Sequence, residues 1–478
     1  MPLASFLSPQ KGGQTLSGPS GHLPQQVGQL KRARLAAALG ALMALTACSV
    51  SWRASTDPPP STKLGQPEYR ALWADAFHEG MHSPDEIDRL VNTAHKANIN
   101  ALFVQVRKNA DAYYLDSLEP VALDIYGPAK FDPLRYLLTR AHGASPRIEV
   151  HAWVNTFYVG TKSPVYFYFG AGWGNRTTAG DTSGYLDPGN KGVRDYTHIV
   201  LMHLAQRYDL DGLHLDYVRY PEGGNWGYSQ AAVDAFNAAA ARSGSPDPND
   251  PAWEQWRRDQ VTSFVRDLYA DLSRKKRRLK LSAALIPWGA GPTAETDWQY
   301  TSAYSEVYQD WYDWLREGIL DLGMPLNYDT AWNSRASRWF EQWIEWEKNN
   351  QFDRRIVIGV GAYFNYPEDT LTQIRRALAR SASGNKAAGV AIYSYASTSP
   401  YGTSDYYADP EAASRLPRQP YAGGLDAFGL RQRADQYNRS FWRLLTAPGS
   451  YNDPVVGAIA TRPVFTEPAA VPVLPWKR

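Results

Sequence analysis

The 478-residue chain contains a single cysteine, and this scarcity excludes several kinds of chemistry. One cysteine cannot supply a redox pair or a cysteine-rich zinc site. The sequence also lacks the His-Glu-x-x-His pattern of zinc peptidases and the Gly-rich phosphate loop of nucleotide hydrolases. Fifty basic and 48 acidic residues leave a net charge of +2, so no overall field attracts nucleic acid. We therefore expect no metal, no other cofactor and no nucleic-acid partner.

The apolar run from Leu35 to Leu45 is too short to cross a bilayer as a helix. Basic residues precede it at positions 31, 32 and 34, as in a secretory signal peptide. The run leads into Leu45-Thr46-Ala47-Cys48, which resembles a bacterial lipobox. These features predict a leader and lipoprotein signal peptide over residues 1–48, with Cys48 as the lipidated residue. An ordinary signal peptide with an incidental cysteine is the alternative.

Residues 49–67 are mostly polar and include Pro58-Pro59-Pro60, so we predict a flexible tether there. A lipid on Cys48 would make the protein a membrane-anchored lipoprotein of the cell envelope that faces outside the cytoplasm. A monomer is the default expectation.

Aromatic residues are abundant, with 17 Trp and 30 Tyr. Many will pack in cores, but such a surplus also suits a surface that grips the apolar faces of sugars.

From residue 68 onward, strand-like segments alternate with helical patterns. Eight such strands are the number at which a parallel sheet closes, so we predict an α/β fold, a single TIM (β/α)8 barrel over residues 68–398. An open doubly wound sheet is the rival, but no Gly-rich fingerprint follows the first strand. Residues 399–478 are expected to hold a closing helix, about Asp426 to Leu445, and a Pro-rich tail. The predicted strands begin at Arg70, Ala101, Arg147, Asp211, Lys280, Leu322, Arg355 and Gly389.

Two strand-to-helix connections, Thr156 to Asn190 and Glu222 to Pro251, are long and carry many aromatic residues. Both follow a strand, so we expect them at the C-terminal rim of the barrel, where active sites are built.

The segment Asp211 to Pro221 places a carboxylate in a predicted strand. Alternation would point His214 and Asp216 into the barrel and leave Tyr217 on the helix-facing side. Buried polar groups are costly unless paired, so polar and aromatic residues gathered at strand ends and rim loops indicate a site. The predicted substrate-binding residues are Trp73, Asp75, Gln105, Arg107, His151, Trp153, Asn155, His214, Arg219, Tyr220, Trp226, Trp288, Asn327, Tyr328 and Tyr363.

Each of these residues also has a structural interpretation when taken alone. Arg107 could neutralise Asp75 or Asp216, His151 could be a satisfied core histidine, and Trp153 could be packing. About half of the rings could simply belong to the core.

Several motifs together resemble the glycosyl hydrolase-like 10 family of bacterial proteins. The resemblance covers roughly Glu68 to Ala396 and implies a TIM barrel that hydrolyses glycosidic bonds. The last motif is similar to the alpha-amylase-type strand that carries a nucleophilic aspartate, which implies that Asp216 is the catalytic carboxylate. His214 departs from that pattern, because such strands usually have arginine there. The motifs are EYRALWADAF from Glu68, NALFVQVRKNADAYY from Asn100, HAWVNTF from His151, YLDPGN from Tyr185 and YDLDGLHLDYVRYP from Tyr208.

Glycoside hydrolysis ordinarily needs a second carboxyl group. The strands that begin at Lys280 and Arg355 end without the glutamates used by related barrels. The remaining candidates are Asp111, Glu222 and Asp329. Burial of Glu222 against Trp226 would raise its pKa toward that of an acid. The sequence does not choose among the three.

We therefore expect a surface-anchored glycoside hydrolase acting on a polysaccharide such as cell-wall glycan, with Asp216 at its centre. The alternative is a carbohydrate-binding lipoprotein on a catalytically impaired barrel.

Overall fold

The computed structural model describes residues 64–402, 418, 427–453 and 455–477, all within one compact unit that spans Thr62–Arg478. The predicted signal peptide, Cys48 and most of the predicted tether lie outside the described residues. Within the described part of the chain, no helix is both long and apolar enough to cross a membrane.

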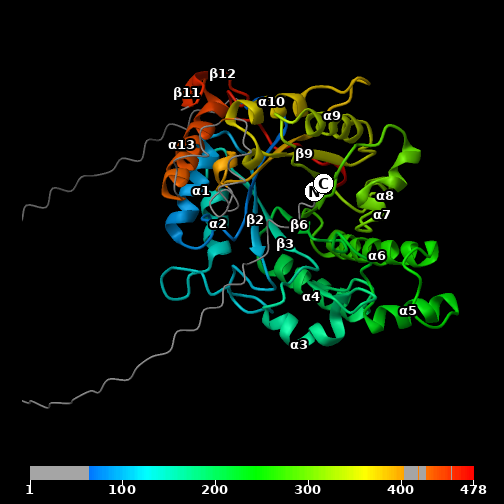
Figure 1. Cartoon of the computed structure of the whole chain (residues 1–478). Helices are drawn as coiled ribbons and strands as arrows, with labels where there is room; N and C mark the ends of the chain where they lie inside the picture. The colour runs from blue at the N-terminus through cyan, green and yellow to red at the C-terminus, as the bar shows by residue number, and fades with distance from the viewer. Residues whose placement is uncertain (1–63, 403–417, 419–426, 454, 478) are drawn as a thin grey trace, which may run out of the picture. The chain divides into compact units, whose positions relative to one another are not determined.

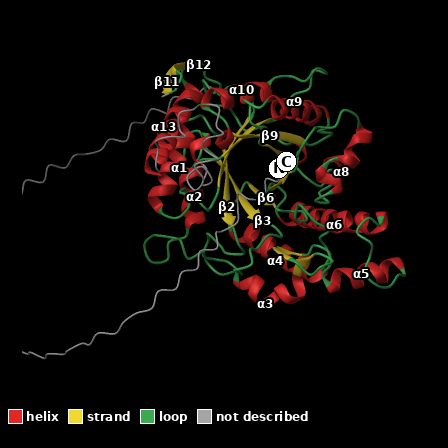
Figure 2. Ribbon diagram, viewed as in Figure 1, coloured by secondary structure: helices red, strands yellow, loops and turns green. Residues whose placement is uncertain are grey.

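Eight parallel strands close into a barrel, in the order β1-β10-β9-β8-β7-β6-β3-β2. This confirms the predicted TIM barrel and excludes the open sheet, because β1 pairs with both β2 and β10. Figure 2 shows the strands inside a surrounding layer of helices. The strands are β1 (Tyr69–Ala74), β2 (Ala101–Arg107), β3 (Glu149–Asn155), β6 (Gly212–Asp216), β7 (Lys280–Leu285), β8 (Leu322–Asn327), β9 (Arg355–Gly361) and β10 (Gly389–Tyr393).

Helices connect successive strands, and the longest connection lies between β6 and β7 (Figure 1). The helices are α1 (Pro84–Lys96), α2 (Pro133–His142), α3 (Pro164–Trp173), α4 (Lys191–Arg207), α5 (Gln230–Ala240), α6 (Pro251–Lys275), α7 (Ser302–Ser305), α8 (Trp311–Glu317), α9 (Ser334–Asn349), α10 (Pro367–Leu378) and α13 (Ala427–Thr446). Short 3-10 turns are η2 (Glu295–Tyr300), η3 (Ala362–Phe364), η4 (Pro400–Gly402) and η5 (Pro475–Lys477). Two hairpins complete the fold: β4 (Gly174–Arg176) with β5 (Thr182–Leu186), and β11 (Gly449–Asp453) with β12 (Gly457–Thr461).

Helix α1 shows why these segments form where they do. The Ser83 hydroxyl accepts a hydrogen bond from the Glu86 amide, and proline occupies the first turn. Its apolar residues recur every three or four positions and pack inward against the barrel. These buried residues are Ile87, Leu90, Val91 and Ala94.

The Pro-rich tail closes the end of the barrel at which the strands begin. Leu474 is buried in an interior cluster with residues of β1, β2, β3, β8, β9 and β10. Beside it, the Trp476 indole and the Lys477 ammonium contact the two carboxylate oxygens of Asp321, at 2.6 and 2.8 Å. The tail therefore contributes core residues to the barrel.

This plug predicts a stability effect far from the rim. We expect Leu474→Ala to lower the free energy of unfolding by about 2–5 kcal/mol, because it leaves a cavity in the barrel interior. The neighbouring Val473 is 65% exposed, so Val473→Ala should change it by less than about 0.5 kcal/mol. Urea denaturation of both variants measures the difference, and equal stabilities would contradict a buried plug.

Candidate active site

Asp216 is the last residue of β6 and lies at the C-terminal mouth of the barrel. The Trp153 indole donates to its Oδ2 over 3.1 Å, and the Tyr217 amide donates to its Oδ1 over 2.7 Å. Burial raises the pKa of Asp216 to about 6, although the Arg219 charge and these two donors oppose the rise. At neutral pH most of this carboxyl group is therefore ionised.

Tyr217 lies beside this carboxylate, which corrects the expectation that it faces the helices. Its backbone has φ of +50°, a left-handed conformation that breaks the alternation of the strand. Its ring packs 5.2 Å from that of Tyr158 and 5.7 Å from that of Tyr185. The sequence did not predict this residue for the site, because the inward-outward alternation of the strand ends at Asp216 and does not extend to Tyr217.

Stacked tyrosines line the mouth opposite Asp216. Tyr328 and Tyr393 stack with ring centroids 5.3 Å apart, and Tyr363 meets Tyr328 edge-on at 5.7 Å. The Trp153 ring lies 6.3 Å from that of Tyr393. Burial raises the pKa of both Tyr328 and Tyr393, and the charge of Asp216 adds to the rise, so their hydroxyls face the same space. The structure brings Trp153, Tyr328 and Tyr363 together as predicted and adds Tyr393, which the sequence reasoning missed.

Arg219 forms the third side of the mouth. Its guanidinium lies 5.0 Å from the Tyr217 ring centroid and 5.2 Å from that of Trp288. It also forms an ion pair of 2.8 Å with Glu222. Arg219 and Trp288 thus offer a charge and a ring at the rim.

Glu222 does not have the elevated pKa expected for an acid. Burial alone would raise its pKa, but the neighbouring Arg219 guanidinium lowers it below the usual value. The Trp226 indole donates to the Glu222 backbone carbonyl, at 3.2 Å, and so fixes the loop. The predicted rise in the pKa of this carboxyl is therefore corrected.

Asp111 is held in a turn after β2. Its Oδ1 accepts hydrogen bonds from the backbone amides of Lys108 and Asn109, at 3.2 and 2.7 Å. This carboxylate shapes the turn, which leaves one of its oxygens for other contacts.

Asp329 follows β8 and has a different environment. Burial raises its pKa to about 7, and no group in the described part of the chain donates a hydrogen bond to its carboxyl oxygens. Its backbone carbonyl accepts from the side-chain amides of Asn365 and Gln373, at 3.0 and 2.9 Å. The loop is fixed while its carboxyl group stays unpaired.

His214 is corrected to a structural residue. It is fully buried, and burial lowers its pKa well below the usual value, which keeps it neutral. The Trp73 indole donates to its Nε2 at 3.1 Å, and its Nδ1 lies 2.9 Å from the Ser282 hydroxyl. Trp73 and His214 are therefore both buried beneath the mouth.

Arg107 and His151 are also corrected to structural roles, because both are fully buried. Arg107 forms a bidentate pair with Glu119, at 2.6 and 2.7 Å, instead of neutralising an aspartate of the site. His151 stacks on Phe103 with centroids 4.2 Å apart, below the level of Asp216.

Four predicted polar binders are buried and hold the loops of the mouth in place. The Gln105 amide donates to the Asn155 side chain at 2.9 Å. Asn327 donates to both oxygens of the buried Glu347, at 3.0 and 2.9 Å. Tyr220 donates to Asp187 at 3.3 Å. In this structure Gln105, Asn155, Asn327 and Tyr220 therefore make internal hydrogen bonds.

Asp75 directly follows β1 and is the last of the predicted polar binding residues. One of its oxygens accepts from the Phe77 and His78 amides and lies 2.8 Å from the His78 ring. Burial alone would raise its pKa, but these hydrogen bonds and the His78 charge lower it. Its charge also raises the pKa of Tyr393, so it borders the mouth as a buried support. Among the described residues, no cluster of three or more histidine, cysteine or acidic side chains could hold a metal ion.

Comparison with known proteins agrees with this geometry. The family model described as glycosyl hydrolase-like 10 matches residues 68–370. Glycosyl hydrolase YngK of Bacillus subtilis (strain 168) is 24% identical over 313 residues, which cover 58% of this chain and 55% of YngK. Glycosyl hydrolase DigH of Escherichia coli (strain K12) is 24% identical over 314 residues, which cover 58% of this chain and 65% of DigH. The match thus spans less than two thirds of either relative.

Among solved structures, the glycoside hydrolase domain of PgaB (BpsB) from Bordetella bronchiseptica superimposes with a TM-score of 0.50 at 14% identity. That match covers 68% of this chain and 94% of the other, and it concerns the fold alone. The barrel, the motifs at its strand ends and the family match agree: this chain belongs to the glycosyl hydrolase-like 10 family.

Proposed function

We propose that this protein is a glycoside hydrolase that cleaves glycosidic bonds of a polysaccharide with Asp216 and Asp329. The observation that carries the proposal is the contrast between the three candidate partners of Asp216. Asp111 accepts two backbone hydrogen bonds and Glu222 is paired with Arg219. The carboxyl group of Asp329 has no partner among the described residues, and burial raises its pKa to about 7.

The two carboxyl groups suit different steps. Near pH 6.5 a large share of Asp329 carries a proton that it can donate to the leaving glycosidic oxygen. Asp216 is largely ionised and can attack the anomeric carbon or deprotonate a water molecule. When the glycosidic C–O bond breaks, water supplies the hydroxyl group of the new reducing end. The rings of Trp153, Trp288 and Tyr328 are positioned to stack on the sugar.

These environments predict a bell-shaped dependence of kcat/KM on pH. Activity should fall below about pH 6, where Asp216 gains a proton, and above about pH 7, where Asp329 loses its proton. Initial rates between pH 4 and 9 measure both limbs. A rate that stays constant from pH 7 to 9 would contradict Asp329 as the proton donor.

Cell-wall glycan is the proposed substrate, because the lipobox-like sequence before Cys48 would anchor the enzyme at a membrane surface beside that polymer. In a bacterial host, Cys48→Ser should move the protein from the membrane to the soluble fraction. Fractionation and immunoblotting measure this change. Retention of the variant in the membrane fraction would contradict the lipid anchor.

The experiment that tests the function is a screen of the chain from Ser49 onward against defined glycans, with new reducing ends as the readout. Cleavage of any glycan supports the hydrolase. Binding without cleavage would favour a carbohydrate-binding protein instead. The absence of a glutamate at the ends of β7 and β9 supports this alternative.

A further inference from the structure

Aromatic residues continue outward from the reaction mouth along one side of the rim. Tyr363 lies edge-on to Tyr328, and Phe364 stacks on Tyr363 with ring centroids 4.0 Å apart. The Trp332 indole then donates to the Phe364 carbonyl over 3.3 Å. These contacts connect the mouth with the loop between β8 and α9.

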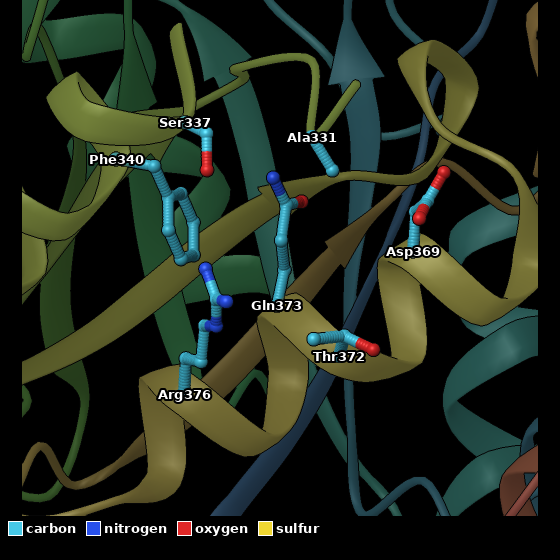
Figure 3. A pocket seen from close by; sticks show the side chains of 7 residues that line it. All are labelled: Ala331, Ser337, Phe340, Asp369, Thr372, Gln373 and Arg376. Carbon is cyan, nitrogen blue, oxygen red and sulfur yellow. The ribbon is translucent and has the colours of Figure 1, made fainter. Parts of the chain in front are cut away.

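Trp332 is the outermost ring of this row and is 40% exposed. Its neighbour in the chain, Ala331, lines a pocket between α9 and α10. Figure 3 shows the Phe340 ring on one side of this pocket, with the Gln373, Asp369 and Arg376 side chains facing the same space. The hydroxyls of Ser337 and Thr372 complete the lining.

The chemistry of this lining suits a sugar unit. The exposed Trp332 ring offers an apolar face beside the pocket, while two hydroxyls and one carboxylate offer hydrogen bonds to ring hydroxyls. Phe340 is only 1% exposed and forms an inner wall of the pocket. Within the described part of the chain, no side chain donates a hydrogen bond to the Asp369 carboxylate, and burial raises its pKa to about 6. The Arg376 guanidinium is bound to Glu341 at 2.6 Å, so the local charge is largely balanced and an anionic ligand is not favoured.

The pocket is also connected to the proposed acid. Gln373 lines the pocket and donates to the Asp329 carbonyl at 2.9 Å. Asn365 donates to the same carbonyl and accepts from the Ala331 amide, at 3.0 and 2.7 Å. Asp329 and the pocket wall therefore belong to one hydrogen-bonded loop of fixed geometry.

We propose that this row of rings and the pocket between α9 and α10 form a distal glycan subsite. It would hold a sugar of the polymer beyond the cleaved bond, so that long glycans bind better than short ones. This inference rests on the proposed function and specifies its substrate as an extended chain rather than a disaccharide.

The test uses the Asp216→Asn variant, which removes turnover, and β-1,4-linked N-acetylglucosamine oligomers of two and six sugars. Calorimetry measures the Kd of each oligomer. Adding Trp332→Ala or Asp369→Ala should weaken hexasaccharide binding about tenfold, and more than disaccharide binding. Trp332→Phe should restore most of the affinity, because it keeps a ring.

Phe352→Ala is the matched control. Phe352 is 43% exposed, close to the exposure of Trp332, but lies in the connection from α9 to β9 at the opposite end of the barrel. It should leave the hexasaccharide Kd unchanged. If Trp332→Ala leaves the hexasaccharide Kd unchanged, the distal subsite is overturned. Failure of the parent chain to bind either oligomer or any glycan of the screen would instead overturn the proposed function.

Discussion

Asp216→Asn should reduce kcat/KM on any cleaved glycan by at least about a thousandfold, which corresponds to roughly 4 kcal/mol of transition-state stabilisation. The amide keeps the size of the side chain and can still accept from Trp153 through its oxygen. It cannot carry the negative charge needed to attack the anomeric carbon or to deprotonate water. The loss should therefore appear in kcat, with little change in KM.

The control for this variant is structural. Burial raises the pKa of Asp216, so its negative charge is unfavourable in the folded protein. The neutral Asp216→Asn variant should therefore melt at the same temperature as the parent or at a higher one. If the variant cleaves as well as the parent, Asp216 is not the catalytic carboxylate. If its melting temperature collapses, Asp216→Glu provides a second measurement that keeps the charge and changes its reach.

Asp329→Asn should reduce kcat about 10²- to 10³-fold on natural glycans, the range typical of a lost general acid. The loss should depend on the leaving group. An aryl glycoside with a very acidic phenol needs no protonation of its departing oxygen, so the variant should cleave it nearly as fast as the parent. The alkaline limb of the pH profile should vanish with the carboxyl group.

Asp111→Asn and Glu222→Gln are the comparison variants for this prediction. Both carboxylates already have partners, so their loss should cost less than that of Asp329. Steady-state kinetics of the three variants on one substrate rank them directly. Two results together would assign the acid to Glu222 instead. Glu222→Gln would lose more kcat than Asp329→Asn, and Asp329→Asn would keep the alkaline limb of the pH profile.

The barrel could be predicted from the sequence because its signals are local. Strand periodicity and helix-start residues repeat eight times, and each unit needs only its own residues to be recognised. The placement of Asp216 at the mouth followed from the same alternation, since it is the last residue of β6.

The remaining errors concern side-chain contacts and a backbone conformation that the periodicity of the sequence does not report. The pairing of Arg107 with Glu119, and of His214 with Trp73 and Ser282, depends on which loops meet in space. The inward turn of Tyr217 depends on a backbone conformation that tyrosine rarely adopts. The choice among three carboxylates likewise depends on burial and on Arg219, which periodicity does not report.

The Pro-rich tail at the N-terminal end of the barrel also affects the order in which the chain folds. The amide of Gly65 donates to the carbonyl of Pro468, and that of Glu68 to the carbonyl of Ala470, so the segment before the first strand is joined to the Pro-rich tail. During synthesis the strands can collapse early, but the base of the barrel stays open until the Pro-rich tail has been made. The exported lipoprotein that we propose would therefore remain short of its final, locked state while it is threaded across a membrane.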